Sequence, residues 1–264
     1  MKKITSLVLV AILSLVVFVG CGAKKDSAAK GLEKVKEAGV LKIGLSDDYP
    51  PMEFRDDKNK LVGFDVDISK ALAEKLGVKA EFVPTSFNGI VVALNSGKFD
   101  SVISAVSITD ERKKQMEFVG PYIEGGQIVI VKKENDTIKS SKDLKGKIVA
   151  CQMGSTGEEA AKKIEGTKEL KKYDKVTEAL QDLAIGRSDA LVVDGQVGRY
   201  YMKKNASKYK VLKDKLTVEP QGIGVKKGNE ELKEGLDKAF KELKDEGKLS
   251  EISKKWFGTD IYKK

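Results

Sequence analysis

The stretch from Ser101 to Arg112, SVISAVSITDER, decides how the rest of the chain is interpreted. Its first half consists mainly of small and β-branched residues, which predict a buried strand. Its second half places Thr109 before Asp110 and Glu111, a pattern typical of a helix N-terminus. Backbone N–H groups at such a junction and the forked guanidinium group of Arg112 can bind one small carboxylate. We therefore expect an anion site here.

On both sides of this stretch, strand-like and helix-like segments alternate, which is the pattern of an α/β protein. Strands are predicted at 40–45, 80–83, 101–106, 117–119, 127–131, 147–151, 173–176, 189–193 and 222–225. Helices are predicted at 64–76, 87–95, 156–164, 177–185 and 195–204, after a cap at Asn229, and through Trp256 and Phe257. Two separate runs of strands in 264 residues indicate two lobes around a cleft.

The first twenty residues have the pattern of an export signal. Lys2 and Lys3 precede an apolar run over residues 7–19. This run is short and close to the start of the chain, so a signal peptide is a better interpretation than a transmembrane span. We therefore exclude residues 1–20 from the fold analysis.

The end of this segment, Phe18 to Cys21, resembles a bacterial lipoprotein cleavage box, in which Cys21 would carry the lipid. Phe18 departs from the usual aliphatic residue, and an ordinary secreted protein or an uncleaved anchor are the alternatives. Residues 21–31 have no apolar periodicity and predict a flexible tether. Cys151, the other cysteine, is then expected to be a buried strand residue without a disulfide partner.

Composition excludes several classes of protein. The chain contains no histidine, which removes Ser-His hydrolases, Cys-His proteases and His-ligated zinc sites. We expect no metal and no cofactor. The 49 Lys and Arg residues exceed the 40 Asp and Glu residues, for a net charge of +9, or +7 without Lys2 and Lys3. This charge is spread over Lys-rich helical faces, so it suits an anionic membrane surface better than nucleic acid.

Four motifs then occur in order between residues 40 and 258. They are LVGFDVD at 61–67, SITDERKK at 107–114, GPY at 120–122 and KKWFG at 254–258. Together they resemble the polar amino-acid substrate-binding proteins of ABC importers, a family 3 group of extracellular solute-binding proteins. The resemblance implies a type II periplasmic-binding-protein fold with two α/β lobes joined by a two-strand hinge.

The resemblance also implies boundaries and partners. Lobe 1 would comprise residues 32–125 plus 224–264, lobe 2 residues 126–223, and the hinge would lie near 125–127 and 220–222. The family has no catalytic step. It implies a monomer, attached to the outer face of the membrane through lipid on Cys21, that closes on a free amino acid and presents it to a membrane permease.

A free amino acid is a zwitterion, so its site must bury a carboxylate and an ammonium group together, each matched by an opposite charge or hydrogen bonds. By the resemblance, Arg112, Thr156 and Ser107 would bind the carboxylate. Asp194, the Ser107 hydroxyl and the Ala105 carbonyl would bind the ammonium. The alternatives are a solvated Arg on a helix face, an ordinary turn at residues 154–157, and an Asp194 that caps the following helix.

The same resemblance implies that the ligand side chain contacts six residues: Tyr49, Phe87, Ser46, Ser104, Glu124 and Gln127. Aromatic faces at Tyr49 and Phe87 suit a flat or cationic group, although Phe87 would also serve in ordinary packing. Relatives that bind basic amino acids or glutamine often have an acidic residue where this chain has Ser46. We expect a polar amino acid, with basic, arginine-like ligands slightly ahead of glutamine and with cystine still open.

Two other classes of function remain as alternatives. The first is an enzyme on the same fold that acts on a small carboxylic acid, and the second is the ligand-sensing module of a signalling system. No motif in the chain is typical of catalysis, and without histidine only carboxylates, Tyr or Lys remain as acids or bases.

Overall fold

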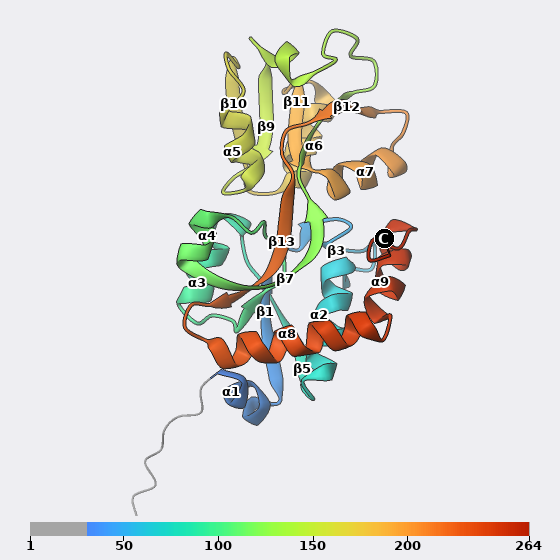
Figure 1. The fold of residues 1–264 in the computed structure, drawn as a ribbon. Coiled ribbons are helices and arrows are strands. Elements are labelled where there is room, and N and C mark those ends of the chain that lie inside the picture. Colours follow the sequence, from blue (N-terminus) through green and yellow to red (C-terminus); the bar gives the residue numbers. More distant parts are fainter. Residues whose placement is uncertain (1–30, 264) are drawn as a thin grey trace, which may run out of the picture.

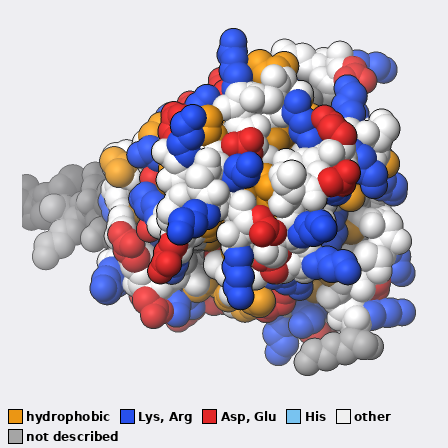
Figure 2. All heavy atoms as spheres, turned by 90° about the horizontal axis from the view of Figure 1, so that it is seen from above, with side chains coloured by type: hydrophobic (Ala, Val, Ile, Leu, Met, Phe, Trp, Pro, Cys, Tyr) orange, Lys and Arg blue, Asp and Glu red, His pale blue; other side chains and the backbone are white. Residues whose placement is uncertain are grey.

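The computed structural model describes residues 31–263, which form two five-stranded sheets and one small three-stranded sheet (Figure 1). The expected signal segment, Cys21 and the expected tether up to residue 30 lie outside the described residues. Within residues 31–263, no helix combines the length and the apolar character needed to cross a bilayer. Figure 2 shows basic and acidic side chains interspersed over one face, in keeping with a solvated charged surface.

The first sheet has the strand order β5-β1-β6-β13-β7. Its strands are β1 (Val40–Leu45), β5 (Lys79–Pro84), β6 (Ser101–Val102), β7 (Met116–Gly125) and β13 (Glu219–Lys226). Strand β1 runs parallel to β5 and β6, whereas β13 runs antiparallel to β6 and β7. The associated helices are α1 (Gly31–Ala38), α2 (Phe64–Lys75), α3 (Ile90–Asn95), α4 (Asp110–Gln115), α8 (Glu230–Asp245) and α9 (Lys248–Phe257). We call this part, with the three-stranded sheet, lobe 1.

The second sheet has the order β10-β9-β11-β8-β12. Its strands are β8 (Gln127–Lys132), β9 (Ile148–Gln152), β10 (Glu169–Tyr173), β11 (Ala190–Asp194) and β12 (Tyr209–Lys215). Its helices are α5 (Thr156–Lys162), α6 (Val176–Ile185) and α7 (Gly195–Lys204), and a 3₁₀ turn spans Ser141–Leu144. We call this part lobe 2. Cys151 is fully buried on β9, as the apolar sequence around it predicts.

Apolar periodicity explains most of these elements. In α2, the side chains of Phe64, Ile68 and Leu72 form the predicted stripe, and all three are fully buried. In α8, the predicted stripe that includes Leu232 and Leu236 is likewise buried. Asn229 occupies the N-cap position of α8, but its side chain makes no capping hydrogen bond.

Several short or charged elements differ from the prediction. The three-stranded sheet β2 (Asp48–Tyr49), β3 (Glu53–Arg55) and β4 (Leu61–Val62) was not predicted, because strands of two or three residues are too short to show a period. Strand β12 was missed, and β10 ends at Tyr173, where the predicted strand begins. Both are edge strands rich in lysine, which hides the apolar signal.

The chain passes between the lobes at two places that lie side by side. It leaves lobe 1 through Gly126, whose φ of +139° suits glycine, and it returns over residues 216–218. A side chain at Gly126 would collide with the Thr217 carbonyl oxygen, 2.3 Å from the added Cβ. Strand β13 begins at Glu219 and pairs with β7 in lobe 1, so residues 219–223 lie in a lobe 1 strand and not, as expected, in lobe 2.

Candidate functional site

Nine residues from both lobes line a small pocket of about 10 Å³. They are Tyr49, Phe87, Ala105, Ser107 and Arg112 from lobe 1, and Gln152, Ser155, Thr156 and Asp194 from lobe 2. All except Gln152 and Ser155 are residues that the sequence analysis assigned to a ligand. The tertiary structure therefore brings together side chains that are far apart in the sequence and places them at the junction of the lobes.

Arg112 points from the first turn of α4 toward lobe 2. The hydroxyl of Thr109, at the predicted N-cap, accepts a hydrogen bond from the Arg112 backbone N–H at 3.1 Å. The guanidinium group donates to the carbonyl oxygens of Ser107 at 3.1 Å and of Gly154 at 3.2 Å. It also lies over the Phe87 ring, 5.5 Å from the centroid. Arg112 is thus held in place on the pocket wall.

Arg112 keeps its positive charge although its guanidinium group is desolvated. Desolvation lowers the pKa of the guanidinium group, while the negative charges of Asp194 and Glu219 oppose that shift. An arginine pKa is so far above neutrality that the group stays protonated. A desolvated, permanently charged fork is well suited to a ligand carboxylate, because the opposite charge and the hydrogen bonds offset the cost of its burial.

Thr156 opens α5 and connects the lobes. Its hydroxyl lies 3.1 Å from the Ser107 hydroxyl and donates to the Glu219 carboxylate at 2.6 Å. Hydrogen bonds, including the one from Thr156, hold the pKa of Glu219 below its usual value even though burial alone would raise it. Glu219 was not recognised from the sequence, because it lies outside the matched motifs.

Asp194 ends β11 and faces lobe 1. It occupies the N-cap position of α7, yet its side chain makes no capping bond. Instead, one carboxylate oxygen accepts from the Tyr49 hydroxyl at 2.7 Å. The other oxygen accepts from the amides of Gln127 at 2.8 Å and Gln221 at 3.1 Å. The structure thus favours the pocket over the alternative of a helix cap.

Burial dominates the titration of Asp194. The residue is 5% exposed, and desolvation raises the pKa of its carboxyl group to about 7, with the Tyr49 hydrogen bond opposing the shift and the charge of Glu219 adding to it. An ammonium group placed beside Asp194 would favour the ionised form and lower this pKa again. Asp194 is therefore poised to respond to a cationic group.

Four of the assigned side-chain contacts do not line this pocket. The Ser104 hydroxyl donates to Glu53 at 2.5 Å and accepts from the Ser46 backbone N–H at 3.0 Å, so both serines contribute to the lobe 1 interior. Glu124 lies on a different pocket, next to helix α7. Gln127, the fourth polar assignment, bonds Asp194 and Thr156 from behind the pocket wall.

Two buried carboxyl groups under the pocket were not predicted. Asp65 accepts from the Ala105 N–H at 2.8 Å and from the Tyr122 hydroxyl at 3.0 Å. Burial raises the pKa of Asp65 to about 6 and raises that of Glu53 well above its usual value. Ala105 has a φ of +48°, which is unusual for a residue with a side chain. Asp65, within the LVGFDVD motif, thus fixes the loop that carries Ala105 to the pocket.

Direct contacts hold the two lobes together around the pocket. Ser86 bonds Asp174, Ser107 lies against Thr156, and Gly154 packs on Asn88 of lobe 1. A Cβ added at Gly154 would lie 2.9 Å from the Asn88 Cα atom, which is closer than side chains tolerate. Any side chain at residue 154 should therefore hold the lobes apart.

We expect Gly154→Ala to weaken binding in this pocket by about tenfold or more, because closure must then displace backbone in lobe 1. Gly146→Ala is the matched control: Gly146 has the same φ of +74° as Gly154, but no atom of residues 31–263 lies within 4 Å of an added Cβ. Both variants should lose similar stability from backbone strain, about 1–2 kcal/mol. Titration calorimetry that shows equal affinities for the two variants would contradict a closed arrangement of the lobes.

Comparison with known proteins places the chain in a family. The family model for bacterial extracellular solute-binding proteins, family 3, matches residues 41–259. The L-cystine-binding protein TcyJ of Escherichia coli K12 is 37% identical over 256 residues, which cover 97% of this chain and 96% of that protein. The arginine-binding extracellular protein ArtP of Bacillus subtilis is 34% identical over 254 residues, covering 95% and 96% of the two chains.

A solved structure of an ancestral arginine-binding protein bound to glutamine is 49% identical to this chain. It superimposes with a TM-score of 0.80 over 83% of this chain and 98% of that one. These likenesses confirm the expected type II periplasmic-binding-protein fold and the resemblance from which it was inferred. The chain belongs to the bacterial extracellular solute-binding proteins, family 3.

Proposed function

We propose that this protein captures a free polar amino acid between its two lobes and delivers it to the permease of an ABC importer. At the level of the family, it is an exported, amino-acid-binding component of such a transporter. The observation that carries the finer proposal is the position of Arg112 and Asp194. They come from opposite lobes and line one pocket, so one small zwitterion can contact both only when the lobes are together.

In this proposal Arg112, Thr156 and Ser107 hold the carboxylate, and Asp194 with the Ala105 carbonyl holds the ammonium group. Binding then stabilises closure, since each half of the ligand satisfies a charge on a different lobe. Tyr49 and Phe87 line the pocket as aromatic walls beside these charges, and aromatic faces suit a flat or cationic side chain.

We further propose that basic, arginine-like amino acids bind slightly better than glutamine. Asp48 supports this ranking: it directly precedes Tyr49, its carboxyl pKa is raised by burial, and one of its oxygens is buried without a hydrogen-bond partner. The Ser46 hydroxyl bonds its other oxygen. Asp48 thus places an acidic group close to Ser46, the position where many relatives have an acidic residue. Relatives named as cystine-binding and arginine-binding keep cystine as a competing ligand.

A thermal melting screen against the twenty amino acids and cystine tests the ligand class. The cognate amino acid should stabilise the folded protein by about 2.7 kcal/mol at a hundredfold excess over its Kd. Asp48→Asn should reduce the shift from arginine more than the shift from glutamine. The same substitution at exposed Asp136 should change neither shift. A screen with no stabilisation by any of these compounds would count against amino-acid binding.

We propose binding without chemical conversion. The alternative is an enzyme that acts on a small carboxylic acid. Its one structural argument is Asp194, because a carboxyl group with a pKa near neutrality can exchange protons with a ligand. Mass spectrometry of the ligand recovered from the screen separates the two: a binding protein returns it unaltered. The proposal also includes a monomer attached to the membrane through lipid on Cys21, as the family resemblance implies.

A further inference from the structure

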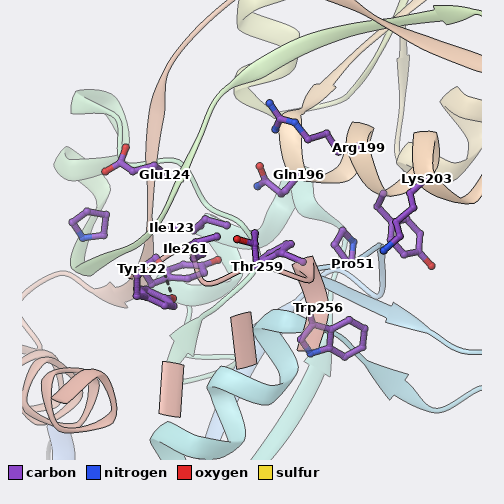
Figure 3. Close-up of a pocket in the computed structure, with 14 residues that line it drawn as sticks. Pro51, Tyr122, Ile123, Glu124, Gln196, Arg199, Lys203, Trp256, Thr259 and Ile261 are labelled. Carbon is purple, nitrogen blue, oxygen red and sulfur yellow. Dashed lines mark hydrogen bonds between the residues drawn. The ribbon is translucent and has the colours of Figure 1, made fainter. Parts of the chain in front are cut away.

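A second and much larger pocket, of about 440 Å³, lies between α7 of lobe 2 and α9 with the C-terminal segment of lobe 1. Figure 3 shows Gln196, Arg199 and Lys203 on α7, on the other side of the pocket from Trp256 and Thr259. In Figure 1, α7 and α9 lie on the side of the molecule away from α4 and α5, which carry Arg112 and Thr156. In the part of the chain that the structure describes, no residue lines both pockets.

The charges around this pocket favour an anion. Arg199 and Lys203 are four residues apart, so they share one face of α7. Among the described residues, neither forms an ion pair within 4.0 Å. Glu124 is the one carboxylate among the described residues on the lining, which leaves the pocket with an excess of positive charge. Two unpaired cations at a concave site are well placed to bind a single carboxylate.

The remaining walls are aromatic. Tyr200 comes from lobe 2, and Trp256, Phe257 and Tyr262 come from lobe 1. Phe54 joins them from behind, with its ring 5.9 Å from both the Tyr200 and the Trp256 rings. Aromatic surfaces favour a flat apolar body, and the volume is within the range of small-molecule sites. The pocket therefore combines a cationic rim with an aromatic interior.

A short hydrogen-bonded path connects this pocket to the amino-acid pocket. The Gln196 amide, on the lining, donates to the Gln221 side-chain oxygen at 2.8 Å. Gln221 in turn donates to Asp194 at 3.1 Å. Since Asp194 also immediately precedes α7, an occupant that shifts α7 would also move the carboxylate proposed to bind the ammonium group.

We propose that this pocket is a second ligand site, for a small aromatic carboxylate, and that its occupancy is coupled to amino-acid binding in the cleft. Its walls come from both lobes, so an occupant that fits between them favours the arrangement of the lobes described here, in which the amino-acid pocket is also formed. By linkage, each ligand then raises the affinity for the other by the same factor. The site goes beyond the proposed transport function, and its occupancy can be measured without any amino acid.

Phenylacetate is the probe, and phenylacetamide is its uncharged counterpart. Trp256 is the chain's single tryptophan and lines the pocket, so its fluorescence reports occupancy directly. We expect a saturable change with phenylacetate and at least about tenfold weaker binding of phenylacetamide. The double variant Arg199→Gln, Lys203→Gln should lose this preference, while Glu124→Gln should strengthen phenylacetate binding.

Lys204→Gln is the matched control, since Lys204 is the next residue on α7 but does not line the pocket. It should bind phenylacetate like the natural sequence, and melting curves will check that each variant is folded. The assignment is overturned by a lack of saturable binding, by equal affinity for the amide, or by no effect of the double variant.

The coupling is tested with arginine as the cleft ligand. Saturating phenylacetate should raise the affinity for arginine by about fivefold, and Gln196→Ala should reduce that gain. An arginine affinity that does not change with phenylacetate would overturn the coupling. If arginine does not bind at all, the proposed preference for arginine-like ligands is wrong. The fluorescence titration with phenylacetate still tests the second site independently.

Discussion

Replacing Arg112 by alanine is expected to reduce amino-acid affinity by about 100- to 4000-fold, the equivalent of roughly 3–5 kcal/mol. The reason is the state of the carboxylate after the change. In the closed pocket it would be taken out of water without its opposite charge, and the neighbouring hydroxyls of Ser107 and Thr156 cannot replace a guanidinium fork.

Titration calorimetry with the amino acid selected by the melting screen measures this effect. Lys113→Ala is the control, because Lys113 follows Arg112 on α4 but pairs with Asp110 at the surface and is 56% exposed. Arg112→Lys should give an intermediate affinity, since it keeps the charge and loses the fork. An affinity in Arg112→Ala equal to that of Lys113→Ala would remove Arg112 from the binding site.

The second large effect is expected at Asp194. Asp194→Asn should weaken binding by about 100-fold or more near neutral pH, because the ligand ammonium group would be buried without a negative partner. Asp136→Asn, with an exposed carboxylate in the same lobe, is the control and should bind normally. Equal affinities of the two variants would place the ammonium group elsewhere.

The same carboxyl group predicts a dependence on pH. Because the pKa of Asp194 is raised to about 7 in the ligand-free protein, the group must release a proton before it can pair with an ammonium group. Below about pH 7, affinity should therefore fall by up to about tenfold for each pH unit, and above it affinity should level off. In Asp194→Asn this dependence should disappear, apart from contributions such as that of Asp65, whose pKa is raised to about 6.

The contribution of Asp194 to the free energy of unfolding depends on pH in the opposite direction to that of an ordinary ion-paired carboxylate. In the unfolded chain Asp194 titrates near its ordinary value of 3.8, while in the folded protein it keeps its proton up to about pH 7. Between these values the folded state binds more protons, so the contribution of Asp194 to the free energy of unfolding falls as the pH rises. Melting curves of the natural protein and of Asp194→Asn, compared across this range, isolate that contribution.

Sequence periodicity predicted the long, well-packed elements of the fold. The helix that begins at Phe64 and the strand over 40–45 carry their burial pattern in the order of their own residues. It failed at the three-stranded sheet and at β12, where pairing with neighbours and not local sequence fixes the strand. Short strands are stabilised by contacts with residues that are distant in the chain, so no local sequence pattern predicts them.

The candidate site was predictable only in part. Motif resemblance assigned Arg112 and Thr156 to the ligand carboxylate, and the structure brings both to one pocket. It also assigned Glu124, which the structure places on another pocket. Neither Gln221 nor the buried Glu53 stood out in the sequence, since each gains its role from partners more than fifty residues away or on another element.

The sequence by itself determined the α/β class, the two runs of strands, the capped first turn that presents Arg112, and the family. Tertiary structure alone decided which charges face one another: Asp194 turns away from its own helix toward Tyr49, and α7 meets α9 around a pocket that no motif marks. The physical reason is that local sequence sets backbone conformation and burial pattern, whereas desolvation and charge pairing depend on side chains that meet only after the chain has folded.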